Sequence, residues 1–224
     1  MKKLIISTSL IIIGLNAWGQ TDSRNYKLSL DFSVSTIKLI NKKNTSITKE
    51  ETNHYKRLDR GKQYAVNLLF KRRNTYSYGV LFSMMEGNKG NFIEIIDNIE
   101  RSFTEQVKIY FIGPTMQIEG HSLSKKINYH FIGSIGYTGY IRNGNSNFFS
   151  WKYKGSTVGL DIRNEILYSI NKVLFVGIQF GINASKLYEI SLETSSSTQP
   201  ITSIEVEESL NRAYAGFTTK IKLK

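Results

Sequence analysis

Charged side chains recur at alternate positions within stretches whose other alternate positions are apolar. The clearest case is Asp161, Arg163 and Glu165, which follow one another two residues apart. Similar positions occur near both ends of the chain, and the whole set comprises Lys27, Asp31, His130, Asp161, Arg163, Glu165, Arg212 and Lys220. A charge enclosed without a partner costs several kcal/mol, so these groups should pair with one another. We therefore expect them to plug a narrow polar interior; a gated pore or a proton path is the alternative that the pattern leaves open.

The sequence offers little for catalysis. Its three histidines, His54, His121 and His130, fall in separate segments, and His54 with the nearby Asp59 forms the best candidate pair. Nucleophilic catalysis needs a nucleophile, a base and an orienting group within hydrogen-bonding reach. The chain contains no cysteine, and it has no HExxH or other metal-ligand spacing. We therefore predict a protein that is not an enzyme and that has no cofactor or metal.

The run of alternating charges belongs to a predicted hairpin at 157–184. Residues 157–168 and 173–184 each alternate between two unlike sets of side chains, and 169–172 separates them. Leu160 and Ile162 share one face of the first run, and Val176 and Ile178 share one face of the second. Period-2 alternation is typical of a β-strand with two different faces. The hairpin should therefore have one apolar and one polar face.

The same alternation predicts eight strands. They lie at 26–37, 62–71, 75–85, 107–118, 127–140, 157–168, 173–184 and 211–223. The connections between them alternate in length, long at 38–61, 86–106, 142–155 and 186–210, and short at 72–74, 119–126 and 169–172. Outer-membrane barrels show this rule, with short periplasmic turns and long extracellular loops. The prediction is an all-β fold, an eight-stranded antiparallel up-and-down transmembrane β-barrel.

Two local features depart from simple alternation. Residues 92–99 have helical spacing, which predicts a turn or two of helix inside the second long connection. Gly113 and Pro114 interrupt the fourth strand. Because proline cannot donate a hydrogen bond to a neighbouring strand, we expect a β-bulge there that switches the apolar residues from one face to the other.

The apolar rows should face outward, toward lipid. The interior of an eight-stranded barrel is just wide enough for side chains to fill, and the polar rows are rich in small Gly, Ser and Asn residues. Aromatic residues gather at strand ends, such as Phe70 and Tyr168 near short connections and Tyr64 and Phe180 nearer the long ones. This placement is typical of the aromatic girdles at membrane interfaces. The alternative is a soluble, lipocalin-like carrier of small apolar ligands, with the same rows inside.

The N-terminus predicts export. Residues 1–19 combine the basic pair Lys2 and Lys3, an apolar core and small residues before Gln20, as in a cleaved signal peptide. The remainder, 20–224, should then form a single barrel domain in the outer membrane. The chain has a formal net charge of +12. For an exported chain this favours membrane lipid and lipopolysaccharide phosphates as partners over nucleic acid.

The long connections are the best place for a binding function. Phe148, Phe149 and Trp151 cluster in the third of them, and exposed aromatic residues are common anchors in interfaces. They could bind a protein or glycan partner. The simpler interpretation is a solvated rim whose cations bridge lipopolysaccharide phosphates.

Three stretches carry a resemblance to a known family. They are the Ala17-Trp18-Gly19-Gln20 junction, the hairpin LDIRNEILY and VLFVGIQFGI, and the closing AYAGFTTKIKLK. Together the chain from about residue 26 resembles the small eight-stranded outer-membrane β-barrel proteins of Gram-negative bacteria, especially the outer membrane protein beta-barrel domain group that includes PorT-like proteins. These barrels usually end on an aromatic residue, whereas this chain ends on Lys224. The resemblance implies a structural or surface-interaction role, or alternatively an accessory role in a protein secretion machine.

Overall fold

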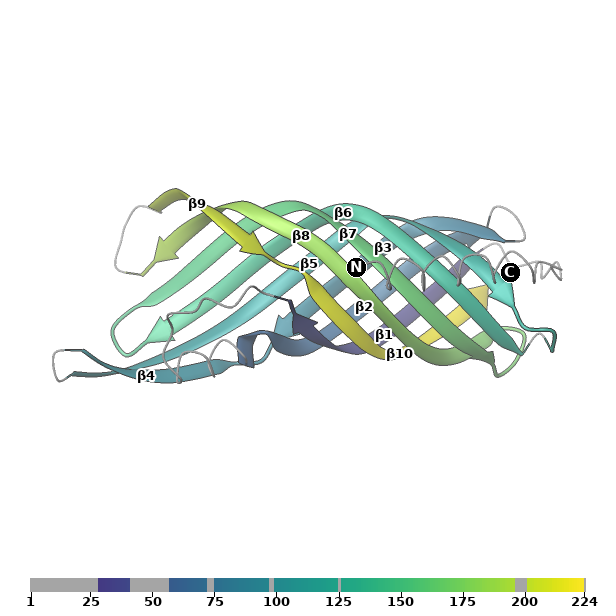
Figure 1. Ribbon diagram of the computed structural model, residues 1–224, viewed down its shortest axis with the longest axis horizontal. Helices are drawn as coiled ribbons and strands as arrows, with labels where there is room; N and C mark the ends of the chain where they lie inside the picture. Colours follow the sequence, from purple (N-terminus) through teal and green to yellow (C-terminus); the bar gives the residue numbers. More distant parts are fainter. Residues whose placement is uncertain are drawn as a thin grey trace, which may run out of the picture.

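The chain forms an elongated barrel of antiparallel strands, with hairpins projecting from one end (Figure 1). The structure is a computed structural model, and it describes residues 28–40, 57–71, 75–96, 99–124, 126–195 and 201–223. The predicted signal peptide at 1–19 and most of the first long connection lie outside the described residues. Cleavage of the signal peptide therefore stays a prediction.

Eight strands close into a ring. In chain order the described strands are β1 (Leu28–Leu39), β2 (Arg60–Lys71), β3 (Tyr76–Gly87), β4 (Gly90–Ile96), β5 (Ile99–His121), β6 (Ile127–Ser146), β7 (Ser150–Ser169), β8 (Leu174–Thr194), β9 (Ile201–Ser209) and β10 (Arg212–Leu223). The ring runs β1-β2-β3-β5-β6-β7-β8-β10, and β10 pairs back to β1. Strand β4 pairs with β5, and β9 pairs with β8. The predicted eight-stranded antiparallel barrel is confirmed.

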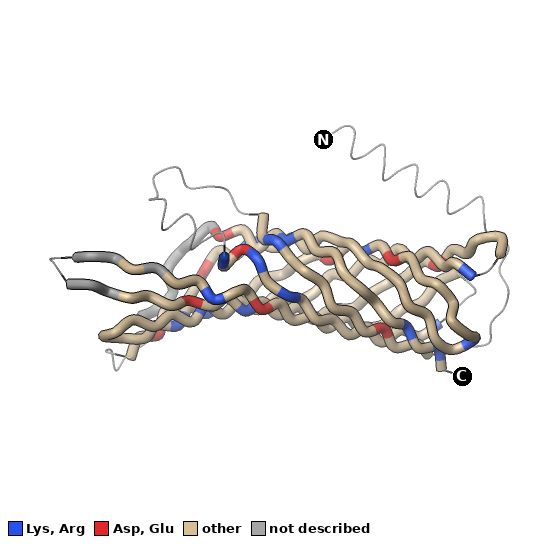
Figure 2. Tube along the Cα trace, turned by 90° about the horizontal axis from the view of Figure 1, so that it is seen from below, with Lys and Arg blue, Asp and Glu red and all other residues tan. Residues whose placement is uncertain are grey.

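The ring is closed by a long, regular seam between the first and last strands. Strand β1 pairs with β10 without a shift from Leu28 opposite Leu223 to Leu39 opposite Arg212. Hydrocarbon cannot hydrogen-bond an exposed backbone group, so a sheet inside a membrane needs this closure. In Figure 2 the strands of the wall cross the long axis obliquely, and the hairpins project at the end opposite the C-terminus. We call these the hairpin end and the turn end.

The apolar rows face away from the barrel axis. Leu160 is 49% exposed and Ile178 is 50% exposed, whereas Asp161 and Arg163 on the same hairpin are buried. Aromatic residues such as Phe70 and Tyr168 are exposed at the turn end, and residues such as Tyr64 and Phe180 nearer the hairpin end. The lipocalin-like alternative required these rows inside and does not fit the structure. No helix in the described part of the chain is long and apolar enough to cross a membrane.

Three of the predicted loops are largely strands. Strands β6 and β7 continue to Ser146 and from Ser150, so most of 142–155 is a hairpin. The segments 86–106 and 186–210 likewise contain β4 with the start of β5, and the end of β8 with β9. The helix predicted at 92–99 is wrong, because β4 covers 90–96 and pairs with β5. Apolar residues spaced closely, as in this segment, fit either a helix or a short strand.

The predicted bulge at Gly113 and Pro114 is also wrong. Strand β5 pairs with β3 in one continuous register through both residues. Its pairing with β6 has a gap at these two positions and resumes in the same register at Thr115 opposite Ser134. Because proline lacks an N–H, it interrupts the ladder locally without shifting it. A register shift occurs instead between β7 and β8, at Gly155 to Gly159.

The apolar residues that suggested a face switch lie inside the barrel. Val107, Ile109 and Phe111 are buried on the inner face of β5, while Ile112 and Met116 are exposed outside. Val107 and Ile109 belong to a buried apolar cluster at the hairpin end that also includes Ile37, Leu39, Leu58, Met85, Tyr140, Leu187, Ile190, Leu210 and Tyr214. We call it the apolar cap. The interior at the hairpin end is therefore mainly apolar, whereas toward the turn end buried polar residues lie among apolar side chains such as Leu69, Leu167 and Phe175.

The outward-facing apolar wall predicts that the cost of a charged substitution depends on its depth in the bilayer. Ile178 lies near the middle of the outer surface of β8, between Ile166 of β7 and Phe217 of β10. Ile178→Arg should lower the free energy of unfolding by about 2–4 kcal/mol, because a cation near the bilayer midplane loses its hydration. The matched control Tyr188→Arg, on β8 beyond the ring, should cost much less. Unfolding by urea in lipid vesicles measures both; equal losses would contradict an outward-facing lipid surface.

Candidate functional site

The interior of the barrel brings together most of the charged residues singled out from the sequence. Asp31, His130, Asp161, Arg163, Glu165, Arg212 and Lys220 are all buried. Lys27 lies outside the described residues. The buried groups form two sets. Asp31, His130, Glu165 and Lys220 belong to an inner network toward the turn end. Asp161, Arg163 and Arg212 belong to an arginine layer closer to the apolar cap.

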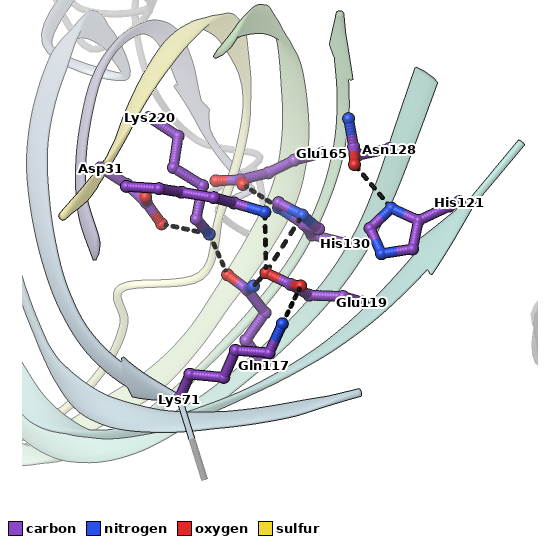
Figure 3. Close-up of polar contacts among 10 residues, drawn as sticks. Asp31, Lys71, Gln117, Glu119, His121, Asn128, His130, Glu165 and Lys220 are labelled. Carbon is purple, nitrogen blue, oxygen red and sulfur yellow. Dashed lines mark hydrogen bonds and ion pairs between the residues drawn. The ribbon is translucent and has the colours of Figure 1, made fainter. Parts of the chain in front are cut away.

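Lys220 joins two strands of the inner network that are distant in sequence. It lies opposite Asp31 where β1 meets β10, and its Nζ is 3.2 Å from Oδ2 of Asp31. The same Nζ donates a hydrogen bond of 2.7 Å to Oε1 of Gln117 on β5, across the lumen (Figure 3). Gln117 in turn donates to Oε1 of Glu119 at 3.0 Å. One ammonium group therefore links opposite walls of the barrel.

Glu119 is the point on which the cations of the inner network converge. Its carboxylate lies 3.9 Å from Nζ of Lys71 and 3.6 Å from Nζ of Lys222. Nε2 of His130 is 3.8 Å from the same carboxylate. The Glu119 side chain is almost fully buried. Charge-assisted contacts in a buried environment are stronger than they are in water. Removing this carboxylate would take away the negative charge that these groups share.

His130 lies between two carboxylates of the inner network. Its Nδ1 is 3.2 Å from Oε2 of Glu165, its direct neighbour across β6 and β7. Its Nε2 faces Glu119 on the other side. Nδ1 is therefore at hydrogen-bond distance from a carboxylate, whereas Nε2 is near one at 3.8 Å. Both of these polar partners of His130 are carboxylates, Glu165 and Glu119.

The arginine layer consists of Asp161, Arg163, Arg212 and Tyr214. Arg163 Nε donates to the hydroxyl of Tyr214 at 3.2 Å, and its Nη2 lies 3.4 Å from Oδ1 of Asp161. The Tyr214 hydroxyl donates to the same Oδ1 at 2.9 Å. Asp161, Arg163 and Tyr214 thus form a closed triangle. Arg212 is buried in the same layer but belongs to no such triangle among the described residues.

Sequence reasoning missed five members of these sets, namely Lys71, Gln117, Glu119, Tyr214 and Lys222. Glu119 was assigned to a short connection because the predicted strand ended at 118, whereas β5 extends to His121. Continuing the period-2 pattern by one more step would have placed Glu119 on the inner face beside Gln117. The sequence contained no signal for the partners that join opposite walls, since those depend on the narrowness of the lumen.

Of the two remaining histidines, the structure describes His121. His54 lies outside the described residues, so its pairing with Asp59 stays a prediction. His121 is at the turn end, where its Nδ1 lies 2.6 Å from Oδ1 of Asn128. Within the described ranges no group of three or more His, Cys, Asp and Glu side chains could hold a metal ion.

The hairpin end carries a second candidate site, on the inner face of the extended sheet. Phe149 and Trp151 have ring centroids 5.4 Å apart, and Phe103 of β5 packs edge-on against Trp151 at 6.0 Å. Trp151 covers its cross-strand neighbour Gly144, where an added Cβ would collide with the indole ring. Phe148 is 64% exposed. We call Phe103, Phe148, Phe149 and Trp151 the aromatic platform.

A charged pair lies below the aromatic platform. Arg142 donates two hydrogen bonds to the carboxylate of Glu105, from Nε at 3.1 Å and from Nη2 at 2.5 Å. Its guanidinium also lies over the ring of Tyr153, 5.9 Å from the centroid. Nearby on β9, burial raises the pKa of Glu208, although Arg142 and a hydrogen bond with Tyr140 act to lower it. These contacts anchor the extended strands to the top of the apolar cap.

A closed antiparallel ring with an apolar outer wall and polar residues inside is the fold of the small outer-membrane β-barrel proteins. Comparison with solved structures agrees. The chain is similar to Neisserial surface protein A (8% identity, TM-score 0.54, covering 88% of this chain and 97% of that one). It is also similar to the outer membrane protein OprG from Pseudomonas aeruginosa (11%, 0.55, covering 90% and 100%).

A major outer membrane protein from Thermus thermophilus gives the same picture, at 9% identity and a TM-score of 0.50, covering 87% of this chain and 99% of that one. At such low identities the likeness establishes the fold alone. No protein-family model and no curated protein matches the chain.

The convergence on Glu119 makes a testable prediction. Glu119→Gln should lower the free energy of unfolding by about 3 kcal/mol, because it leaves buried cations without their carboxylate. The control Glu193→Gln removes the acid of an exposed pair with Lys154 at the hairpin end and should have little effect. Urea unfolding in detergent micelles, followed by tryptophan fluorescence, measures both variants. Equal losses would show that the inner network does not hold the barrel together.

Proposed function

We propose that this protein is a non-conducting, non-enzymatic barrel of the Gram-negative outer membrane, with short turns in the periplasm and hairpins at the cell surface. Its role would be structural or surface-interacting. The observation that carries this proposal is the division between a ring filled with side chains and a sheet that continues far beyond it. The closed ring would span the membrane. The extended sheet lies beyond the ring and would provide the surface that contacts a partner.

The filled interior supports a closed lumen. Arg163, Arg212 and Lys220 are among the largest side chains that are fully buried, together with Phe111 and Phe175. The inner network and the arginine layer occupy the turn end and the middle, and the apolar cap occupies the hairpin end. An ion crossing this interior would have to displace paired charges and then enter an apolar region, at a high electrostatic cost.

Basic residues on the outer surface support lipopolysaccharide as a partner. Where the wall meets the hairpin end, outward-facing cations form a belt that comprises Lys38, Arg60, Lys62, Lys108, Lys152, Lys154 and Lys186. Fewer acids accompany them, among them Glu86 near Lys108 and Glu193 near Lys154. Cations at the level of the outer headgroups would pair with phosphates there.

The aromatic platform supports a protein or glycan partner at the cell surface. Phe148 and Phe149 are exposed at the tip of the β6–β7 hairpin, and Trp151 holds Phe149 in place from below. Aromatic side chains held rigidly above a charged pair lose little conformational freedom on binding, which makes them effective anchors.

The closed lumen predicts a negative result in planar bilayers. The wild-type chain and Arg163→Ala should both show no stable ion conductance, because the apolar cap and the inner network remain in the variant. Arg163→Ala should nevertheless lower thermal stability, since Asp161 and Tyr214 lose their shared donor. A large, steady conductance of the wild-type barrel would overturn the closed lumen.

The aromatic platform predicts a partner that can be captured at the hairpin end. The chain has no cysteine, so Asn147→Cys at the exposed hairpin tip gives a single cross-linking position in intact cells. Adding Phe148→Ala, Phe149→Ala and Trp151→Ala should abolish the cross-linked product because the anchors are lost. The control Tyr188→Ala removes an exposed aromatic residue outside the platform and should leave the product unchanged.

Two outcomes of this experiment would change the assignment. A product that survives the triple substitution would remove the aromatic platform as the binding face. The companion variant Leu123→Cys places the cross-linker at a fully exposed turn at the opposite end. A secretion component captured there would favour the accessory role that the PorT-like resemblance implies.

A further inference from the structure

Arg212 is a fully buried arginine with no hydrogen-bond acceptor among the described residues. Its exposure is 0%, and none of its three guanidinium nitrogens has a partner there. It is the first residue of β10, and its buried side chain belongs to the arginine layer next to the apolar cap. Leu39 of the cap lies directly opposite on β1. A guanidinium group is charged at every physiological pH. An isolated charge in this position would strongly destabilise the barrel.

The groups beside Arg212 are also unsatisfied. Asn183 lies opposite it on β8, and neither the Nδ2 nor the Oδ1 of Asn183 has a hydrogen-bond partner within the described ranges. Asp161 lies opposite Asn183 on β7, and its Oδ2 is likewise unpartnered in this part of the chain. Arg212, Asn183 and Asp161 therefore form one row across three neighbouring strands. Two donors, the guanidinium and the Asn183 amide, are available in it.

The carboxylate of Asp161 does not balance the arginine layer. Its Oδ1 already accepts from both Arg163 and Tyr214. Arg163 and Arg212 carry two positive charges, and Asp161 is the one carboxylate among the four residues of the layer. In the inner network, by contrast, Lys71, Lys220 and Lys222 match Asp31, Glu119 and Glu165. Among the described residues, this count leaves one positive charge in excess, and Arg212 is the cation of the arginine layer without a hydrogen-bond acceptor there.

Neutral polar groups in the same interior do not raise this problem. Gln63 and Asn67 also have buried atoms without partners among the described residues, but an enclosed water molecule satisfies an amide completely. Water satisfies the hydrogen bonds of a guanidinium group without supplying a negative charge. The apolar cap next to Arg212 excludes solvent, and a lower local dielectric strengthens the attraction for an anion.

We propose that the barrel binds one small inorganic anion of the chloride type inside its lumen, held by the Arg212 guanidinium and the Asn183 amide. The anion supplies the missing negative charge of the arginine layer. A larger anion would have to displace more of the side chains that are buried in the lumen. This inference is independent of the surface role proposed above, since it concerns only the interior of the ring.

The test compares thermal unfolding at two chloride concentrations. The full chain is folded in detergent micelles at constant ionic strength, with gluconate replacing chloride because it is too large for the site. Raising chloride from 1 to 100 mM should raise the unfolding midpoint by on the order of 5 °C, if binding is tight at the lower concentration. Arg212→Met should lose this dependence, because the variant has no excess charge. Lys126→Met removes an exposed cation and should keep it.

A direct measurement decides the position of the ion. In crystals grown with bromide, anomalous scattering should show one peak within hydrogen-bonding distance of the Arg212 guanidinium. The native chain alone gives this result, so it holds even where Arg212→Met fails to fold. The proposal is overturned by a native midpoint that is the same at both chloride concentrations, or by an Arg212 guanidinium in direct contact with Asp161 and no bromide nearby.

Discussion

The closure of β1 onto β10 is the constraint on which the rest of this structure depends. Backbone N–H and C=O groups have no alternative partners in hydrocarbon, so each strand must be paired on both sides. Once the ring is closed, every inward side chain shares one enclosed space, and every outward side chain meets lipid. Leu160 and Asp161 are adjacent in sequence and yet occupy these two environments. The alternation of the sequence is the direct consequence.

The narrow ring then dictates how its charges are arranged. With only eight strands, side chains from opposite walls meet, as Lys220 of β10 and Gln117 of β5 do. A charge in this interior therefore needs a partner, because the surrounding side chains keep bulk solvent away from it. The inner network meets this condition through Glu119, and the arginine layer meets it only for Arg163. Arg212 therefore differs from the other buried cations in having no hydrogen-bond acceptor among the described residues.

Period-2 alternation was sufficient to predict the ring, because one face of each strand lies in hydrocarbon and the other in a polar interior. Closure makes the strands of Asp31, Lys220 and Arg212 neighbours, so a contact of Asp31 with Lys220 or Arg212 could be anticipated; the structure shows the contact with Lys220. The hairpin extensions could not be predicted in the same way. Beyond the membrane the outer face of the sheet meets water, so Lys152 and Lys154 occupy outward positions that an apolar row would fill within the bilayer. Apolar side chains inside the ring, such as Val107 and Ile109, were misleading because they resemble a lipid-facing row.

The ring also explains why the hairpin end is one-sided. Strands β1, β2, β3 and β10 end near the level of the apolar cap, whereas β5 to β8 continue past it and gain β4 and β9 at their edges. The closed barrel therefore opens into a curved sheet that covers only part of the mouth. Its concave face continues the inner face of the ring, which is why Tyr153 packs against the apolar cap while Trp151, two residues earlier, belongs to the aromatic platform. Below the apolar cap, lipid requires apolar residues on the outer face of the strands. Above the cap, contact with lipid does not restrict the residue types.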